Sequence, residues 1–252
     1  MTVYCLYFSA CGSSRRCALA AARGVSADVV EVNLTNRTQM PPETKAGDVI
    51  VAAAPVYSGR IPKPLAQKLA KARFEGAFAC AVVVYGNRAY EDALIELADL
   101  LAAAGASVIT AGAFVARHVF VPELAKGRPD AVDLAQLKAL GERTAQKIAA
   151  GETAPVTVAG NRPYREVPPA SMVPLVDASV CRKCGLCAFN CPAGAISASD
   201  PVQTDINLCI DCMRCVEGCP EQARSLPPQA LAFIRSKLSP LIGVRRENDI
   251  FC

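Results

Sequence analysis

The chain has 252 residues, of which 52% are apolar, and a formal net charge of +4. This composition supports a substantial core, and the scattered charge argues against nucleic-acid binding. The longest apolar run, 100–116, is interrupted by glycine and hydroxyl residues, so we expect no membrane span. No secretory or twin-arginine signal precedes the apolar run that begins at Val3, so we expect a cytoplasmic protein.

The first 150 residues alternate short apolar segments with amphipathic ones. Apolar runs rich in β-branched residues predict buried strands at 3–8, 28–32, 48–54, 78–85 and 107–115. Helices are predicted in later stretches: a short one from Pro64, one over 93–105, and one that follows a cap at Asp130. Residues 1–152 therefore predict an α/β fold with a doubly wound, five-stranded parallel sheet.

The composition changes beyond this part. Residues 153–176 are rich in proline and glycine and predict an extended linker. Residues 177–226 contain an internal repeat with a period of 28 residues, in which Asp177…CRKCGLCAFNCP corresponds to Asp205…CIDCMRCVEGCP. Residues 227–252 predict a helical tail, with the helix at about 229–238, and the chain ends on Cys252.

Eight of the thirteen cysteines lie in this repeat, which predicts a metal site because a reducing compartment disfavours disulfides. Each half reads C-x2-C-x2-C-x3-C-P, the bacterial ferredoxin spacing in which the fourth cysteine binds the cluster of the other half. We therefore predict a small α+β ferredoxin module with two [4Fe–4S] clusters. One would be held by Cys181, Cys184, Cys187 and Cys219, the other by Cys209, Cys212, Cys215 and Cys191. Structural zinc is the alternative, but zinc sites use separated cysteine pairs.

Polar loops follow three of the predicted strands. The first, FSACGSSRRC at 8–17, places serines before a helix, where backbone amides and the helix dipole bind anions. It matches neither the dinucleotide fingerprint nor the Walker loop, and a simple helix cap is the alternative. The stretches APVYSGRIP at 54–62 and YGNRAYED at 85–92 leave two further strands. Because ligands bind at this edge of doubly wound sheets, we expect one cofactor site there.

The whole chain resembles a family in which a flavodoxin domain is fused to a ferredoxin. In flavodoxins the first loop reads roughly S/T-x-T-G-x-S/T and wraps the FMN phosphate, and here Cys11 replaces the middle threonine. The resemblance implies an FMN site, with Tyr57 and Tyr90 beside the flavin ring. The implied site residues are Ser9, Ala10, Cys11, Gly12, Ser13, Ser14, Pro55, Val56, Tyr57, Ser58, Gly59, Tyr85, Gly86, Asn87, Arg88 and Tyr90.

We therefore expect an electron-transfer protein that passes electrons between two clusters and FMN and that meets redox partner proteins. The alternatives are an FMN-dependent reductase of a small acceptor, or a flavin-free domain that only docks a ferredoxin. No acid–base set is evident, because His118 is the only histidine. Two clusters add negative charge to the C-terminal region, so we expect the ferredoxin module to dock over the loop edge of the more basic N-terminal part.

Overall fold

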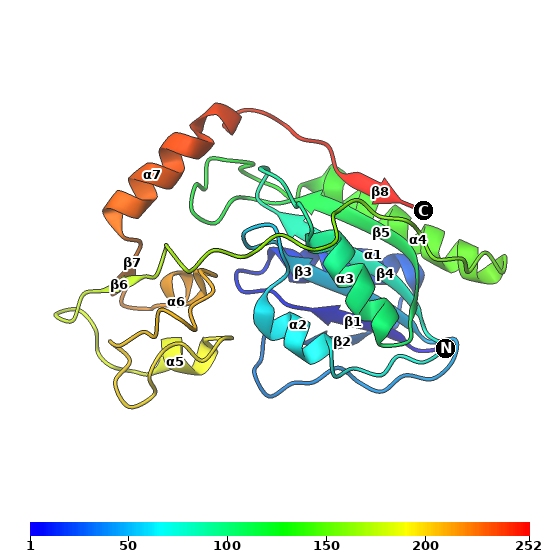
Figure 1. Ribbon diagram of the computed structural model, residues 1–252, viewed down its shortest axis with the longest axis horizontal. Coiled ribbons are helices and arrows are strands. Elements are labelled where there is room, and N and C mark those ends of the chain that lie inside the picture. Colours follow the sequence, from blue (N-terminus) through cyan, green and yellow to red (C-terminus); the bar gives the residue numbers. More distant parts are fainter.

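A six-stranded sheet forms the centre of the computed structural model, which describes residues 1–252 (Figure 1). In spatial order the strands are β2 (Val30–Asn33), β1 (Val3–Tyr7), β3 (Val49–Pro55), β4 (Phe78–Tyr85), β5 (Ser107–Val115) and β8 (Asp249–Phe251). The first five are parallel, and β8 is antiparallel to β5. The order β2-β1-β3-β4-β5 is that of flavodoxin-like doubly wound sheets, so the predicted fold class is confirmed.

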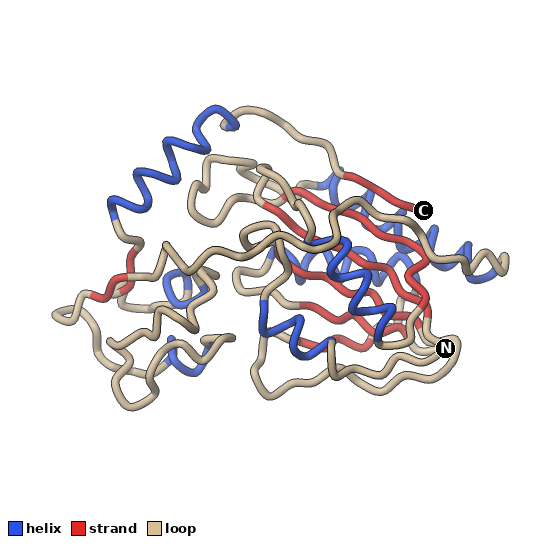
Figure 2. Tube along the Cα trace, viewed as in Figure 1, coloured by secondary structure: helices blue, strands red, loops and turns tan.

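The sixth strand is a correction to the expected five-stranded sheet and helical tail. Within the tail, α7 (Pro228–Leu238) and a 3-10 turn (Ser239–Leu241) are helical, but β8 pairs with residues 111–113 of β5. Figure 2 shows the chain leaving α7 and returning to the sheet as this strand. A strand of three residues is too short to carry a periodic apolar pattern, so the sequence did not reveal it.

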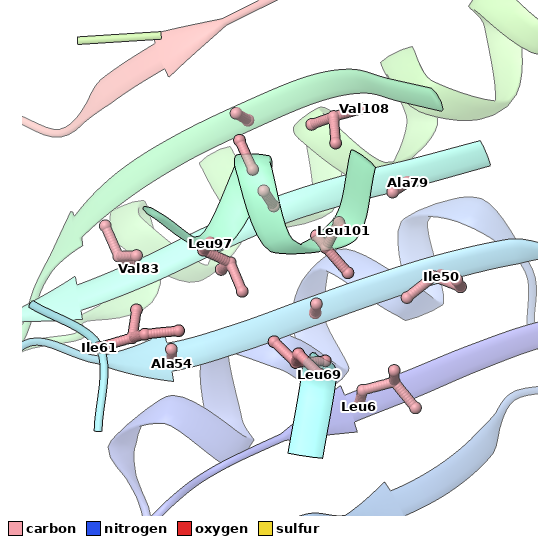
Figure 3. Close-up of a cluster of buried hydrophobic side chains, with 14 of the residues drawn as sticks. Leu6, Ile50, Ala54, Ile61, Leu69, Ala79, Val83, Leu97, Leu101 and Val108 are labelled. Atoms are coloured by element: carbon pink, nitrogen blue, oxygen red, sulfur yellow. The ribbon is translucent and has the colours of Figure 1, made fainter. Parts of the chain in front are cut away.

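Helices cover both faces of the sheet. Those against one face are α1 (Ser13–Val25) and α4 (Ala131–Ala149), and those against the other are α2 (Lys63–Leu69) and α3 (Ala93–Ala103). The central strands are buried on both sides, which explains their near-continuous apolar sequences. Figure 3 shows Leu97 and Leu101 of α3 over β3 and β4. None of the helices has the length and apolar composition that crossing a membrane requires.

The linker predicted for 153–176 contains no helix or strand until its end, but it is fixed along α3. Asp92 accepts hydrogen bonds from the amides of Asn161 and Arg165, each at 2.8 Å. The guanidinium of Arg162 donates to Asp99 at 2.9 Å. The linker therefore holds the following cysteine-rich segment at a defined place beside the sheet.

Residues 175–225, called the cysteine module below, contain short elements only. These are β6 (Leu175–Val176), α5 (Leu186–Asn190), α6 (Arg214–Glu217) and β7 (Arg224–Ser225). The two halves of the repeat have equivalent hydrogen bonds. The Asp177 amide donates to Ala223 O at 2.9 Å, and 28 positions later the Asp205 amide donates to Ala195 O at 2.7 Å. The repeat in the sequence is therefore an approximate two-fold relation in the structure.

Candidate functional site

A cavity of about 1370 Å³ lies at the carboxyl ends of β1, β3 and β4, where the three polar loops meet. Figure 1 shows the cysteine module beyond these strand ends, with α7 above the module in this view. The residues predicted for the flavin that line this cavity are Ala10, Cys11, Gly12, Ser13, Ser14, Pro55, Val56, Tyr57, Ser58, Gly59, Tyr85, Gly86 and Arg88. The structure thus brings residues of all three loops to one cavity.

The first loop leaves the start of α1 open. Gly12 has φ +94°, a left-handed conformation that turns the chain from β1 into the helix. Ser9 does not line the cavity, and its hydroxyl oxygen accepts a hydrogen bond from the Arg15 amide at 3.0 Å. No side chain caps the helix at Gly12, and no acidic residue lies in its first turn. The first-turn amides of Ser13 and Ser14 and the helix dipole are therefore available to an anion.

The second loop is a tight turn that presents Tyr57. Tyr57 and Arg60 form an isolated β-bridge, and the two residues between them have φ values of +50° and +82°. Two successive positive φ values are typical of a type I′ turn. Burial raises the pKa of the Tyr57 hydroxyl well above its usual value, and the Cys212 and Cys11 thiols add to this shift. Tyr57 therefore stands, as a neutral phenol, where the first loop meets the cysteine module.

Asn87 and Tyr90 of the third loop do not line the cavity. The Tyr90 hydroxyl donates to Asp249 at 2.7 Å, and the Asn87 amide group donates to Val244 O at 2.8 Å. Both side chains hold the C-terminal tail against the sheet. Tyr85, whose ring lies 5.5 Å from that of Tyr90 in an edge-on arrangement, lines the cavity instead.

The opposite wall of the cavity comes from segments that the sequence did not assign to the site. Met172 of the linker, Phe233 of α7 and His118 after β5 all line it. Apolar residues of a linker or a short helix carry no local signal for a ligand site, because they reach the cavity only through the tertiary fold. The site is therefore enclosed by the linker and the tail as well as by the sheet loops.

His118 is held neutral in this wall. Burial, together with a smaller contribution from the nearby positive charge of Arg88, lowers the pKa of its imidazole to about 4. Its Nδ1 accepts a hydrogen bond from the Phe120 amide at 3.2 Å, so the proton of the neutral ring lies on Nε2. The ring can therefore donate a hydrogen bond from Nε2 without carrying a charge at neutral pH.

We expect the His118 imidazole to show no titration between about pH 5.5 and 8, whereas an ordinary histidine titrates near 6.5. Its lowered pKa favours the folded state at and above pH 6.5, and this contribution falls as the pH drops toward 4. NMR of protein labelled in histidine can measure this without assignment, because the chain has one histidine. A midpoint near 6.5 in the folded protein would contradict the buried environment.

The cysteine module contains a second, smaller cavity lined by four thiols. They are Cys191 of the first half of the repeat and Cys209, Cys212 and Cys215 of the second half. Burial raises the pKa of Cys212 to about 12 and that of Cys209 to about 11. At neutral pH these two thiols therefore stay protonated until a metal binds the sulfur and displaces the proton. The chemistry of the lining, four sulfur ligands around one space, fits an iron–sulfur cluster.

Around its cysteines, the first half of the repeat has the same local backbone geometry as the second half. Gly185 and Met213 occupy equivalent positions before α5 and α6 and have φ values of +76° and +59°. Cys184 is exposed, whereas its counterpart Cys212 is buried, and Cys181, Cys187 and Cys219 are half-buried. The two halves thus differ in their surroundings more than in their backbone.

The cysteine module contacts the first loop of the sheet directly. The Cys11 thiol donates to Cys212 O at 3.3 Å, and the Arg214 guanidinium donates to Ala10 O at 3.1 Å. Arg117 forms an ion pair with Glu217 at 2.8 Å. The module therefore lies at the loop edge of the sheet, where the sequence predicted it.

Residues 180–224 match the family model of the 4Fe-4S dicluster domain. A 73-residue stretch is 37% identical to an uncharacterized ferredoxin of Methanocaldococcus jannaschii, over 25% of this chain and 48% of that protein. The chain therefore spans about half the length of this relative.

Similar solved structures match the other end of the chain. Flavodoxin 1 of Bacillus cereus is 15% identical, with a TM-score of 0.43 over 58% of this chain and 98% of that one. Rubredoxin oxygen:oxidoreductase of Desulfovibrio gigas is 17% identical, with a TM-score of 0.43 over 61% and 37%. With the strand order described above, the chain thus joins an α/β part of flavodoxin-like topology to a C-terminal 4Fe-4S dicluster domain of the ferredoxin type.

Proposed function

We propose that the protein is an iron–sulfur flavoprotein that transfers electrons between two [4Fe–4S] clusters and one FMN. The observation that supports this most is that Cys209 and Cys212 line both cavities. A cluster bound by these thiols and a flavin bound at the sheet edge would share a wall made of cluster ligands. Two cofactors that exchange electrons directly must lie close together, and this arrangement would place them so.

The cluster ligands follow from the four-thiol cavity and the two-fold relation of the repeat. Cys191, Cys209, Cys212 and Cys215 would hold the cluster beside the large cavity. The repeat relates these positions to Cys219, Cys181, Cys184 and Cys187, which would hold the second cluster. Each set takes three thiols from one half and the fourth from the other, so neither half is expected to bind a cluster alone.

The FMN phosphate would lie at the open N-terminus of α1, on the amides of Ser13 and Ser14 and on the hydroxyl of Ser14, which lines the cavity. Arg16, in the same turn, lines the cavity, and its guanidinium donates only to Pro129 O. Its charge is therefore available to a phosphate. Tyr57 and Tyr85 supply aromatic surface for the flavin ring. When bound, FMN supplies the exchange between one-electron and two-electron chemistry.

This proposal divides the chain into four parts. Residues 1–152 would bind FMN, 153–176 would link, 177–226 would bind the clusters, and 227–252 would close the cavity with α7 and tie the end of the chain to the sheet by β8. The many unpaired thiols favour a reducing compartment, and we propose the cytoplasm.

Specific observations favour two other functions. The cavity of about 1370 Å³ exceeds the roughly 300–1,000 Å³ of ordinary ligand sites, which leaves room for a small acceptor beside FMN, as in a reductase. Conversely, Cys11 and the carbonyl of Ala10 contact the cysteine module, which favours a first loop used for docking without flavin. Flavin content separates the docking function from the other two, and turnover with small acceptors identifies a reductase.

The test is a comparison of FMN with riboflavin on protein purified without oxygen. Ser14→Ala is expected to weaken FMN binding about ten- to a hundredfold, the effect of one hydrogen bond to a charged group. Riboflavin binding should be unaffected, because it has no phosphate. Ser26→Ala, at the opposite end of α1, is the matched control. Equal binding of riboflavin and FMN would contradict the phosphate site, and intact clusters without any flavin would favour the docking function.

A further inference from the structure

The two halves of the repeat differ in what covers them. In the second half, the segment 210–214 is covered by the sheet loops and the linker, and Asp211 accepts hydrogen bonds from two linker amides, at 2.9 and 3.1 Å. In the first half, the equivalent segment 182–186 faces solvent, and Cys184 is exposed. One half is therefore docked within the chain, and the equivalent face of the other half is free.

The free face also differs in chemistry. Arg214 and Glu217, which bind the N-terminal part of the chain, correspond in the repeat to Leu186 and Phe189. Both counterparts are exposed, and Phe189 is 79% exposed. An aromatic side chain this far out of a core is typical of the centre of a docking surface. We call Val180, Arg182, Lys183, Leu186 and Phe189 the outer face.

We propose that the outer face is the docking surface for a small acidic protein that carries one electron. The carrier would exchange its electron with the cluster of Cys181, Cys184, Cys187 and Cys219. One electron leaves the carrier and one arrives at this cluster, and no bond or proton is exchanged. The inference rests on the proposed function, because it places one end of the electron path at this face and the other at the cavity.

The charge of the outer face selects an acidic partner. Arg182 and Lys183 lie between the first two cysteines of the motif, where the docked half has Ile210 and Asp211. Arg182 forms an ion pair with Glu221 at 3.2 Å, and Lys183 forms one with Asp200 at 3.3 Å. The two basic side chains are 76% and 63% exposed, whereas the acidic ones are only 27% and 37% exposed. The positive charges therefore project farthest into solvent. An acidic patch on a carrier would be attracted over a distance of about a Debye length.

The same charges argue against a second copy of this chain as the occupant. In a symmetric dimer the same patch meets itself, so Arg182 and Lys183 of both copies would come together around Phe189. Like charges at an interface are unfavourable. A partner with the opposite charge and an apolar centre avoids this repulsion and still covers the aromatic side chain.

The experiment uses the complete protein with its clusters and a plant-type [2Fe–2S] ferredoxin, a small acidic carrier, as the probe. Stopped-flow spectroscopy measures the second-order rate of electron transfer, and chemical cross-linking measures complex formation. Arg182→Glu with Lys183→Glu is expected to slow transfer about tenfold at low salt, and the effect should vanish at high salt. Lys138→Glu with Arg143→Glu on α4 is the matched control, because these residues form similar surface ion pairs.

Phe189→Ser is the second variant and tests the apolar centre. It is expected to reduce cross-linking and transfer severalfold at every salt concentration, with reduction by dithionite unchanged. Unchanged rates in both variants, no reaction with the ferredoxin, or loss of a self-association on Phe189→Ser would each overturn the docking inference. In all these cases normal reduction of FMN through the clusters by dithionite would leave the proposed function intact. Failure of that internal step would instead contradict the proposed function.

Discussion

Cys191→Ala is expected to remove the cluster held with Cys209, Cys212 and Cys215, although Cys191 belongs to the other half of the repeat. Four thiolates hold a [4Fe–4S] cluster, and the cavity of the cysteine module places Cys191 with these three. Iron content should fall from about eight to about four atoms per chain, with sulfide in proportion. Cys252→Ala is the control, because this exposed thiol lies outside the module.

Double variants identify which cluster is lost. Cys191→Ala combined with Cys212→Ala should lose no more iron than Cys191→Ala alone, because both residues would serve the same cluster. Cys191→Ala combined with Cys184→Ala should lose nearly all iron, because each residue would serve a different cluster. The reverse pattern would show that each half of the repeat binds its own cluster and would contradict the proposed ligand sets.

The sequence predicted most of the sheet because the central strands are buried on both faces. Residues 78–85 and 107–115 are strands with the predicted bounds. The second strand was predicted at 28–32 but lies at 30–33, because only Val32 of this edge strand is buried and the apolar signal is weak. Asp130 caps α4, as its side chain and position predicted. The apolar pattern of a strand and the cap of a helix depend on residues that are close in sequence, so both can be predicted from the sequence alone.

The residues of the candidate site were predicted less completely from the sequence than the strands of the sheet. Ser9 was predicted as a phosphate ligand, but its hydroxyl accepts the Arg15 amide and does not line the cavity. Tyr90 was predicted beside the flavin ring, but its hydroxyl donates to Asp249 of a strand that the sequence did not reveal. In each case the side chain already has a hydrogen-bond partner, which is local for Ser9 and distant in sequence for Tyr90.

The contact between the first loop and the cysteine module predicts that a variant that loses this contact reduces its FMN more slowly. Arg214 donates to the carbonyl oxygens of Ser9 and Ala10, at 3.3 and 3.1 Å. Arg214→Leu places in the second half the residue that the first half has at the equivalent Leu186, so the local fold should tolerate it. Loss of these charge-assisted hydrogen bonds should shift the docked module toward undocked states by about 1.5–3 kcal/mol, or roughly ten- to a hundredfold.

The expected result is slower reduction of FMN by a low-potential donor, with iron, sulfide and FMN contents unchanged. Stopped-flow spectroscopy of the intact protein measures the rate, and residues 1–152 alone give the rate without clusters. Arg182→Leu on the outer face is the matched control, because it removes the same charge from the module without touching the first loop. Cys11→Ser keeps a donor to Cys212 O and should stay close to the parent rate, whereas Cys11→Val should be slower. The flavin of the Arg214→Leu variant and that of residues 1–152 alone could both be reduced as fast as in the parent at equal donor concentration. The docked cluster would then not pass electrons to the flavin.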